Sequence, residues 1–274
     1  MKLKKHYPSV HLALVLAGAV MVFPFIWMLL SSFKTVGEQM SLPVTILPSS
    51  FTYTENYEQA LNAVPFVRLY GNTLLMIAGR CICAILFSSM AGYGFARFNF
   101  PGKNFLFTLV LIQMMVPSQV FIIPQYQILS KLGLLNTVFA LIFPGLVSAY
   151  GTFLLRQHYM SLPRELEEAA VLDGCNPWQT FSKVMLPMTK SGVAALGVFT
   201  ALFAWKDLMW PLIANNDINQ MSLAPGLSVL QGMCYTNKGA LMAGSVIATV
   251  PMVILYFIFQ KQFMEGIAQT GIKG

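Results

Sequence analysis

Charged residues are scarce in this chain. They make up 10% of its 274 residues, whereas soluble domains average about 25%. Hydrophobic residues make up 56%, and the mean hydropathy is +0.65. This balance excludes an ordinary soluble domain and indicates a polytopic membrane protein. The net charge of +7 is expected when basic residues gather in cytoplasmic loops, so it does not indicate nucleic-acid binding.

Cysteine and histidine are also few, with four and three residues respectively. Cys81 and Cys83 lie inside an apolar run, where free cysteine behaves as a small hydrophobic residue. Cys175 and Cys234 stand alone in the sequence, and no spacing of cysteine or histidine fits a metal site. We therefore expect neither a disulfide nor a bound metal.

Motifs for nucleotide hydrolysis are missing as well. The phosphate-binding loop pattern G-x-x-x-x-G-K-[ST] fails at the one Gly-Lys pair, Gly102-Lys103, because Asn104 follows it and Arg97 stands where the first glycine belongs. The chain also lacks G-x-G-x-x-G, G-x-S-x-G and H-E-x-x-H. We predict that it is not itself an ATPase or hydrolase and holds no cofactor, so any ATP it depends on is hydrolysed by a partner.

Six apolar runs are long enough to cross a bilayer, which takes about 20 mostly apolar residues. The first follows three lysines, as in a signal peptide, but it exceeds the usual apolar length of about 7–15 residues, so we expect an uncleaved span. We predict an all-α polytopic membrane protein with six transmembrane helices, forming one domain over residues 1–274 with a core at 69–264. The predicted spans are Val10–Phe33, Leu69–Ala96, Phe105–Leu129, Thr137–Leu155, Val193–Ile213 and Ala240–Phe259.

The lysines and arginines predict the orientation, since basic residues favour the cytoplasmic side. With the N-terminus inside, eleven of the 17 fall in cytoplasmic segments, four fall outside and two lie within spans. Both termini are therefore predicted to be cytoplasmic, and the long segments 34–68 and 215–239 form extracytoplasmic loops that can contact a partner. The inside residues are Lys2, Lys4, Lys5, Arg97, Lys103, Arg156, Arg164, Lys183, Lys190, Lys261 and Lys273, and the outside ones are Lys34, Arg68, Lys131 and Lys238.

The segment 162–188, LPRELEEAAVLDGCNPWQTFSKVMLPM, is a polar interruption between the fourth and fifth predicted spans. Pro163 and the glutamates after it suit the first turn of a helix, and Gly174 suits its left-handed end. Asn176 and Gln179 have the spacing of a capping box for a second helix. Helical spacing predicts that this second helix has one apolar face, made of Trp178, Phe181, Met185 and Met188.

Three uses fit a cytoplasmic helix-turn-helix of this kind. An amphipathic loop on the membrane surface would favour basic residues over the three glutamates. A DNA-reading element would need lysine and arginine for its phosphate contacts. The acidic cluster therefore favours docking onto another protein.

The spacing of this segment resembles the coupling loop of ABC-transporter permeases. That pattern is E-A-A, three residues, G, nine residues, I, one residue, L-P; here Val184 in place of isoleucine is the one departure. The resemblance implies that the loop docks into a cleft of a separate ATPase subunit. The residues implied for this contact are Glu167, Glu168, Ala169, Ala170, Asp173, Gly174, Leu186 and Pro187.

Other stretches, between Ser31 and Gly274, resemble the carbohydrate-uptake (maltose-type) branch of binding-protein-dependent permeases: NYEQAL, NTLL, AGYGFARF, WKDLMWPLI and FMEGIAQTGIKG. The resemblance implies a multi-pass protein in the plasma membrane of a prokaryote. Its implied partners are a second permease subunit (a heterodimer), two ATPase subunits that bind ATP and magnesium, an extracytoplasmic substrate-binding protein and membrane lipids. It also implies that the tail with Glu265, Gly266 and Lys273 reaches the ATPase interface, and that the loop before the sixth span contacts the binding protein.

Ionisable residues within spans usually face the protein interior or water, because a charge at mid-bilayer costs about 2.5–3.5 kcal/mol on insertion scales. Lys206 and Asp207 lie near the outer end of the fifth predicted span. Either they have structural roles, with Arg80 as a potential partner of Asp207, or they line a translocation path. The predicted path residues are Asn72, Arg80, Trp205, Lys206 and Asp207.

The sequence thus predicts a permease subunit of an ATP-driven ABC importer that moves a sugar or oligosaccharide by alternating access. A stand-alone secondary transporter or channel is the alternative, although no internal inverted repeat supports it. A membrane scaffold that transports nothing is a third class. Where the family often has W-N-[DE], this chain has Trp205-Lys206-Asp207, so the resemblance does not specify the sugar.

Overall fold

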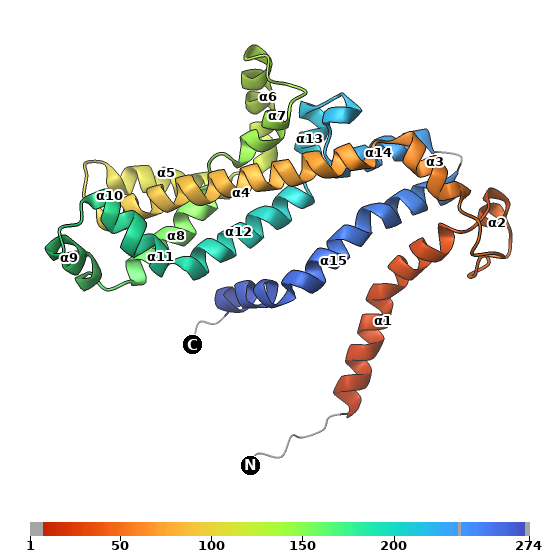
Figure 1. The fold of residues 1–274 in the computed structure, drawn as a ribbon, viewed down its shortest axis with the longest axis horizontal. Helices are drawn as coiled ribbons and strands as arrows, with labels where there is room; N and C mark the ends of the chain where they lie inside the picture. The colour runs from red at the N-terminus through yellow and green to blue at the C-terminus, as the bar shows by residue number, and fades with distance from the viewer. Residues whose placement is uncertain (1–7, 235–236, 272–274) are drawn as a thin grey trace. The chain divides into compact units, whose positions relative to one another are not determined.

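The structure is a computed structural model that describes residues 8–234 and 237–271. All regular secondary structure in these residues is helical, as predicted (Figure 1). The chain forms two compact units, one from Met1–Phe66 with Gly226–Phe257 and one from Val67–Pro225 with Ile258–Gly274. The single domain predicted for residues 1–274 remains a prediction.

The first unit holds α1 (Pro8–Ser31), α2 (Val36–Met40), α3 (Glu55–Ala63), most of α14 (Leu223–Met233) and most of α15 (Lys238–Gly271). The apolar side chains of α1 are exposed in the single chain, which is expected of a helix that faces lipid or another subunit. Pro24 and Pro251 lie inside α1 and α15 without ending either helix.

A buried asparagine ties the first unit together. Asn56 of α3 is fully buried, and its amide nitrogen donates to the carbonyls of Ser32 and Lys34, both at 2.8 Å. Its amide oxygen accepts a hydrogen bond from Asn237, just before α15, at 3.1 Å. Because buried polar groups need partners, these bonds fix α3 against the end of α1 and the start of α15.

A second polar contact shapes the loop after α1. Thr35 and Glu38 form a capping box at the start of α2, and Glu38 also accepts a hydrogen bond from the backbone of Ser49. Hydrogen bonds from Ser49 and Thr35 lower the pKa of the Glu38 carboxyl to about 2. Because this pKa is lower in the folded loop than in the unfolded chain, the ionised Glu38 carboxylate stabilises the folded loop at pH values above the ordinary carboxyl pKa. This stabilisation is lost as the pH falls towards 2.

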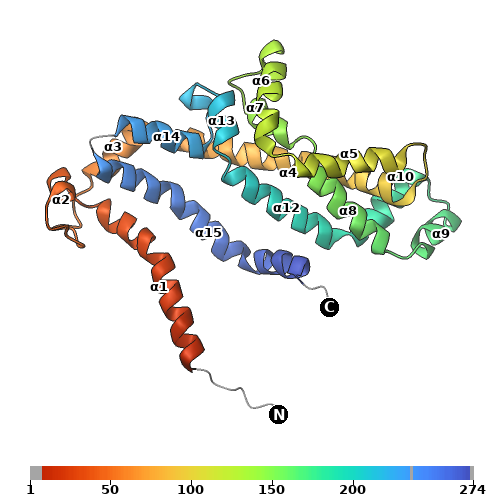
Figure 2. The ribbon, with the colours of Figure 1, turned by 180° about the vertical axis from the view of Figure 1, so that it is seen from behind.

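The second unit is built on the long helix α4 (Phe66–Arg97), against which α8 (Ala149–Ser161) and α12 (Lys190–Trp205) pack (Figures 1 and 2). Small residues allow this close approach. A Cβ on Gly92 would lie 2.9 Å from the backbone nitrogen of Arg156, and one on Gly192 would lie 2.6 Å from the His158 ring. Such contacts are typical of packed helices in membranes, where small residues let backbones come close.

Short helices complete the second unit. They are α5 (Lys103–Met115), the 3₁₀ turn η1 (Ser118–Phe121), α6 (Ile122–Lys131), α7 (Val138–Ile142), η2 (Phe143–Gly145), α9 (Glu165–Leu172), α10 (Pro177–Gln179), the π-helical η3 (Thr180–Met185), α11 (Leu186–Met188), α13 (Met209–Ala214) and η4 (Ile218–Gln220).

Two described helices are long and apolar enough to cross a membrane unbroken, Ser9–Ser31 and Phe66–Arg97. Three bent helix pairs raise this number to five if each pair is one span, and Lys238–Ile254 is a shorter apolar stretch. The six predicted spans therefore stay a prediction, although each predicted run is largely helical.

The third and fourth predicted spans are each bent. The chain bends by 104° between α5 and η1, where Val116 is extended before Pro117, and by 46° near Pro144. Proline lacks a backbone N–H and disfavours helical geometry in the residue before it, which explains the first bend directly.

The prediction that Val193–Ile213 forms one helix is wrong. Helix α12 ends at Trp205, and α13 begins at Met209, so Lys206 and Asp207 lie in the break. Pro211 explains the break, because its ring would clash with the carbonyl of the residue four positions earlier, Asp207, in a continuous helix.

Candidate functional site

Three of the helix breaks in the second unit line one cleft of about 1200 Å³. Its walls come from the α5–η1 break, the η2–α8 break and the α12–α13 break. Non-helical backbone at membrane depth is tolerated where it lines a cavity. Polar and charged side chains on these walls are Arg80, Gln113, Ser118, Gln119, Gln125, Ser148, Tyr150, Thr200, Lys206 and Asp207, and the other aromatic ones are Phe121, Phe199, Phe203 and Trp210.

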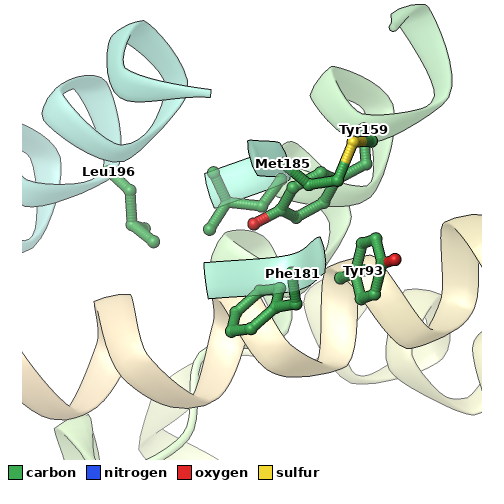
Figure 3. Close-up of a cluster of buried hydrophobic side chains, with 6 residues drawn as sticks. Tyr93, Tyr159, Phe181, Met185 and Leu196 are labelled. Atoms are coloured by element: carbon green, nitrogen blue, oxygen red, sulfur yellow. The ribbon is translucent and has the colours of Figure 1, made fainter. Parts of the chain in front are cut away.

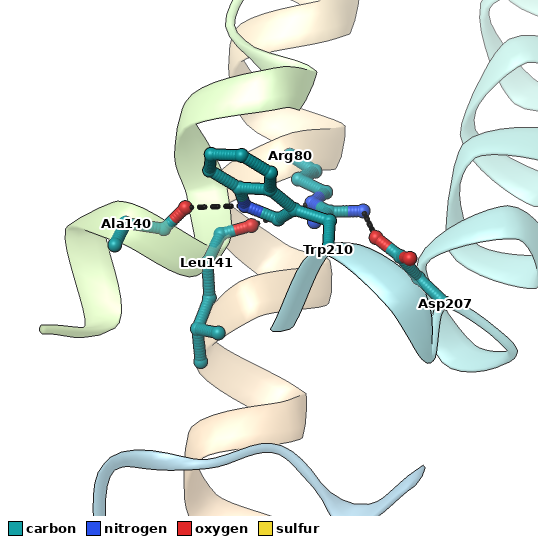
Figure 4. A network of polar contacts seen from close by, with 5 residues as sticks. All are labelled: Arg80, Ala140, Leu141, Asp207 and Trp210. Carbon is teal, nitrogen blue, oxygen red and sulfur yellow. Dashed lines mark hydrogen bonds and ion pairs between the residues drawn. The ribbon is translucent and has the colours of Figure 1, made fainter. Parts of the chain in front are cut away.

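An ion pair crosses one wall of the cleft. Arg80 Nη1 lies 2.8 Å from Asp207 Oδ2, and Arg80 Nε donates to the Leu141 carbonyl at 2.8 Å (Figure 4). The two side chains are 9% and 22% exposed, so the pair is largely desolvated. The Arg80 stem passes close to Gly145, where a larger residue would displace it. The suggested pairing of Arg80 with Asp207 is confirmed as a contact.

The sequence did not single out Trp210, which fixes the other side of the break. Its indole nitrogen donates to the Ala140 carbonyl at 2.8 Å (Figure 4). Its side chain packs with Leu129 and Ala214. A buried indole usually finds such a partner, but its distance from Ala140 along the chain hides the pairing from sequence patterns.

The remaining predicted path residues differ in their surroundings. Lys206 is exposed at the cleft, with its Nζ 4.7 Å from the centre of the Phe203 ring. Asn72 and Trp205 are not among the cleft residues. The Asn72 amide donates instead to the carbonyls of Asn219 and Met221, at 2.8 and 2.9 Å, and so holds the segment around η4.

The polar segment 162–188 forms the predicted helix-turn-helix at one end of the second unit (Figure 1). Gly174 has φ +81°, and the Cys175 nitrogen donates to the Ala170 carbonyl at 2.9 Å, which closes α9 as a left-handed cap. Asn176 and Gln179 form the predicted capping box of α10. Pro163 lies before the helix rather than in its first turn, because α9 begins at Glu165.

The predicted apolar face of the second helix is only half buried. Phe181 and Met185 lie in a cluster with Tyr93 and Tyr159, whereas Trp178 is 58% and Met188 54% exposed (Figure 3). The π-helical turns of η3 are wider than α-helical ones, so residues spaced for an α-helix no longer share one face.

The residues predicted to contact an ATPase divide into two groups. Glu168, Ala169, Asp173, Gly174 and Pro187 are exposed. Ala170 is buried, Leu186 is packed against the aromatic cluster, and Glu167 turns inward towards Arg97. The sequence interpretation missed two large exposed apolar side chains of this element, Val171 at 64% and Leu172 at 88%. The tail residues Glu265, Gly266 and Lys273 were also predicted to contact the ATPase. The structure describes the backbone at Glu265 and Gly266 but not their side-chain surroundings, and Lys273 lies outside the described residues.

A cleft with polar and aromatic walls between broken apolar helices is typical of membrane transport proteins. The chain belongs to the family described as binding-protein-dependent transport system inner membrane component, which matches residues 84–268.

Similar proteins cover nearly the whole chain. The arabinooligosaccharides transport system permease protein AraQ of Halalkalibacterium halodurans is 35% identical over 93% of this chain and 92% of its own length. The diacetylchitobiose uptake system permease protein NgcG of Streptomyces coelicolor is 32% identical over 94% and 86%. A chain of a bacterial ABC transporter involved in import of the acidic polysaccharide alginate has a TM-score of 0.78 at 21% identity, over 92% of this chain and 94% of its own, and so shows the same fold.

Proposed function

We propose that the chain is a permease subunit of an ATP-driven ABC importer that moves a sugar or oligosaccharide by alternating access. The observation that carries this function is the coupling element, in which the E-A-A spacing coincides with a left-handed Gly174 and an exposed Glu168. Family membership and relatives named for arabinooligosaccharides and diacetylchitobiose support the import of carbohydrate. These findings favour an importer subunit over a stand-alone transporter or channel.

The chemistry of the cleft fits a carbohydrate. Sugars present hydroxyl groups that donate and accept hydrogen bonds, and apolar C–H faces that stack on aromatic rings. The cleft offers both kinds of partner, with Gln113 and Gln125 among its polar side chains and Phe199 and Phe203 among its aromatic ones. Binding sites of this kind combine apolar walls with a small number of placed polar groups.

The energy for transport comes from partners in this proposal. Two ATPase subunits bind ATP and magnesium, a second permease subunit completes the path, and an extracytoplasmic binding protein delivers the sugar. The exposed residues Glu168, Val171 and Leu172 form the surface of the coupling element that meets the ATPase. The uncovered apolar helix α1 meets lipids or the second permease subunit.

For the topology we propose six spans in the plasma (inner) membrane of a prokaryote, with both termini cytoplasmic. The basic residues support this, because Arg97 ends α4, Lys103 begins α5 and Arg164 directly precedes α9. A cluster of basic residues beside the spans favours the cytoplasmic side.

In intact cells, a membrane-impermeant thiol reagent should therefore label Cys234 and spare Cys175. Both residues are half-buried, and burial raises the pKa of the Cys234 thiol, so labelling is best run near pH 8.5, where more thiolate forms. Cys175→Ser and Cys234→Ser variants assign the signals, and permeabilised cells give the total for Cys175. Labelling of Cys175 from outside intact cells contradicts the orientation.

The function itself is tested by uptake into proteoliposomes that contain the chain with its second permease, ATPase and binding protein. We expect arabinooligosaccharide or chitobiose-like sugars to enter only with ATP. Uptake that continues without the ATPase contradicts the proposal.

A further inference from the structure

Arg97, the last residue of α4, contacts the coupling element at two points. Its Nη2 donates to the Leu162 carbonyl at 2.7 Å, immediately before the turn into α9. Its Nε lies 3.6 Å from Glu167 Oε1 on α9. The Arg97 side chain is only 6% exposed and that of Glu167 20%, so the attraction between them is weakly screened by water.

Tyr93, one turn earlier on α4, adds an aromatic contact to the coupling element. Its ring packs at 5.4 Å from the Tyr159 ring on α8 and at 5.2 Å from the Phe181 ring in η3 (Figure 3). The end of α4 therefore contacts both helices of the coupling element, α9 through charge and η3 through aromatic packing.

Glu167 and Glu168 are consecutive but face different surroundings. Successive residues of an α-helix point about 100° apart, because one turn takes about 3.6 residues. Glu168 is exposed, whereas Glu167 points back to the end of α4. Within the acidic cluster, Glu168 is therefore free to meet another subunit, whereas Glu167 contacts the end of α4.

We propose that Arg97 and Glu167 are positioning residues that transmit movement between the coupling element and α4. The inference rests on the proposed function, since it concerns how ATP hydrolysis on a partner reaches the cleft. Arg80 lies on the same helix α4 and lines the cleft, so a shift of the coupling element that moves α4 also moves that wall. The Arg97–Glu167 distance exceeds hydrogen-bond length, and neither Nε nor Oε1 has another hydrogen-bond partner among the described residues, so the contact is an electrostatic one that neutral substitutes cannot make.

The test uses the complete importer complex in proteoliposomes and measures sugar transported per ATP hydrolysed, with the amount of assembled ATPase determined in parallel. We expect Arg97→Gln and Glu167→Gln each to keep assembly and to lower this ratio by about tenfold, as the loss of a contact between charged groups does. Arg97→Lys, which keeps the charge, is expected to recover part of the ratio. Glu165→Gln is the matched control, since it removes an exposed acid from the same helix.

Exchanging the charges of Arg97 and Glu167 distinguishes a role in transmitting movement from a role in packing alone. Glu167→Arg alone should lower the ratio further, and combining it with Arg97→Glu should recover about threefold, as coupled neighbouring charges do. Tyr93→Phe keeps the ring in its cluster and removes only the hydroxyl, so it should assemble fully and keep the parental ratio.

The outcomes are distinguishable. If the parent complex shows no ATP-driven import, the proposed function is wrong. If the parent imports and the assembled Gln variants keep its ratio, the inference is overturned. If the Gln variants do not assemble, Arg97→Lys and the exchanged pair decide in the same assay. A parental ratio in Arg97→Lys, together with no recovery in the exchanged pair over Glu167→Arg alone, overturns the inference.

Discussion

Gly174→Val is expected to abolish ATP-driven uptake by the complex, whereas Gly174→Asn retains most of it. Gly174 has φ +81°, and a left-handed conformation costs an L-residue about 1–2 kcal/mol, with a greater penalty for a β-branched side chain. Asparagine tolerates this conformation better than other residues do. A Cβ at this position would meet nothing within 4 Å, so the expected loss comes from backbone geometry and not from a clash within the chain.

The measurement for this series is the initial uptake rate together with the amount of ATPase that copurifies. We expect the order Asn, Ala, Val, with at least a tenfold loss for Val, since a cost near 1.4 kcal/mol changes an equilibrium about tenfold. Parental uptake by the Val variant contradicts the role of the turn. If the Gly174→Asn and Gly174→Val variants are equally inactive, the glycine is needed for close contact with the ATPase. That result would contradict the backbone explanation.

Breaking the Arg80–Asp207 pair is the change with the second largest expected effect. Removing one member of a buried ion pair costs about 3–5 kcal/mol, and the 22% exposure of Asp207 places this pair at the lower end of that range. Arg80→Met leaves a carboxylate without its cation, and Asp207→Leu leaves a guanidinium with one bond, to the Leu141 carbonyl. Each single variant should lower the thermal midpoint of the purified complex by several degrees.

The double variant Arg80→Met with Asp207→Leu separates stability from transport. Replacing both charges with apolar side chains is often neutral for stability, so the thermal midpoint should recover. Uptake should stay low if the pair forms part of the translocation path. Lys206→Met is the stability control, because Lys206 is exposed and its loss should not change the midpoint. Full recovery of uptake in the double variant restricts the pair to a structural role.

The helical nature of the chain and the helix-turn-helix were predictable because both depend on local patterns. Apolar runs of sufficient length specify helices, and the Gly174 cap and the Asn176–Gln179 capping box each depend on a few neighbouring residues. The breaks were harder to predict. Pro24 and Pro251 sit inside continuous helices, whereas Pro117 and Pro211 accompany breaks, so proline alone does not distinguish the two cases.

The site was predictable only in part, because its contacts join residues far apart in sequence. The charges of Arg80 and Asp207 within apolar runs indicated a pairing, which the structure contains. Nothing in the pattern indicated that Asn72 would bond the backbone near η4, or that Glu167 would turn towards Arg97 while Glu168 stays exposed. Those assignments depend on which helix faces lie against each other, and a single sequence does not specify that packing.

The most direct test of the account is sugar uptake by the reconstituted complex under three conditions: with ATP, with ATP and an ATPase subunit that cannot hydrolyse it, and with an ion gradient alone. Each condition includes the binding protein loaded with an arabinooligosaccharide or a chitobiose-like sugar. The account predicts accumulation only with ATP and an active ATPase, and loss of that accumulation when this chain is omitted. Uptake by this chain alone, or uptake driven by the ion gradient, would contradict it.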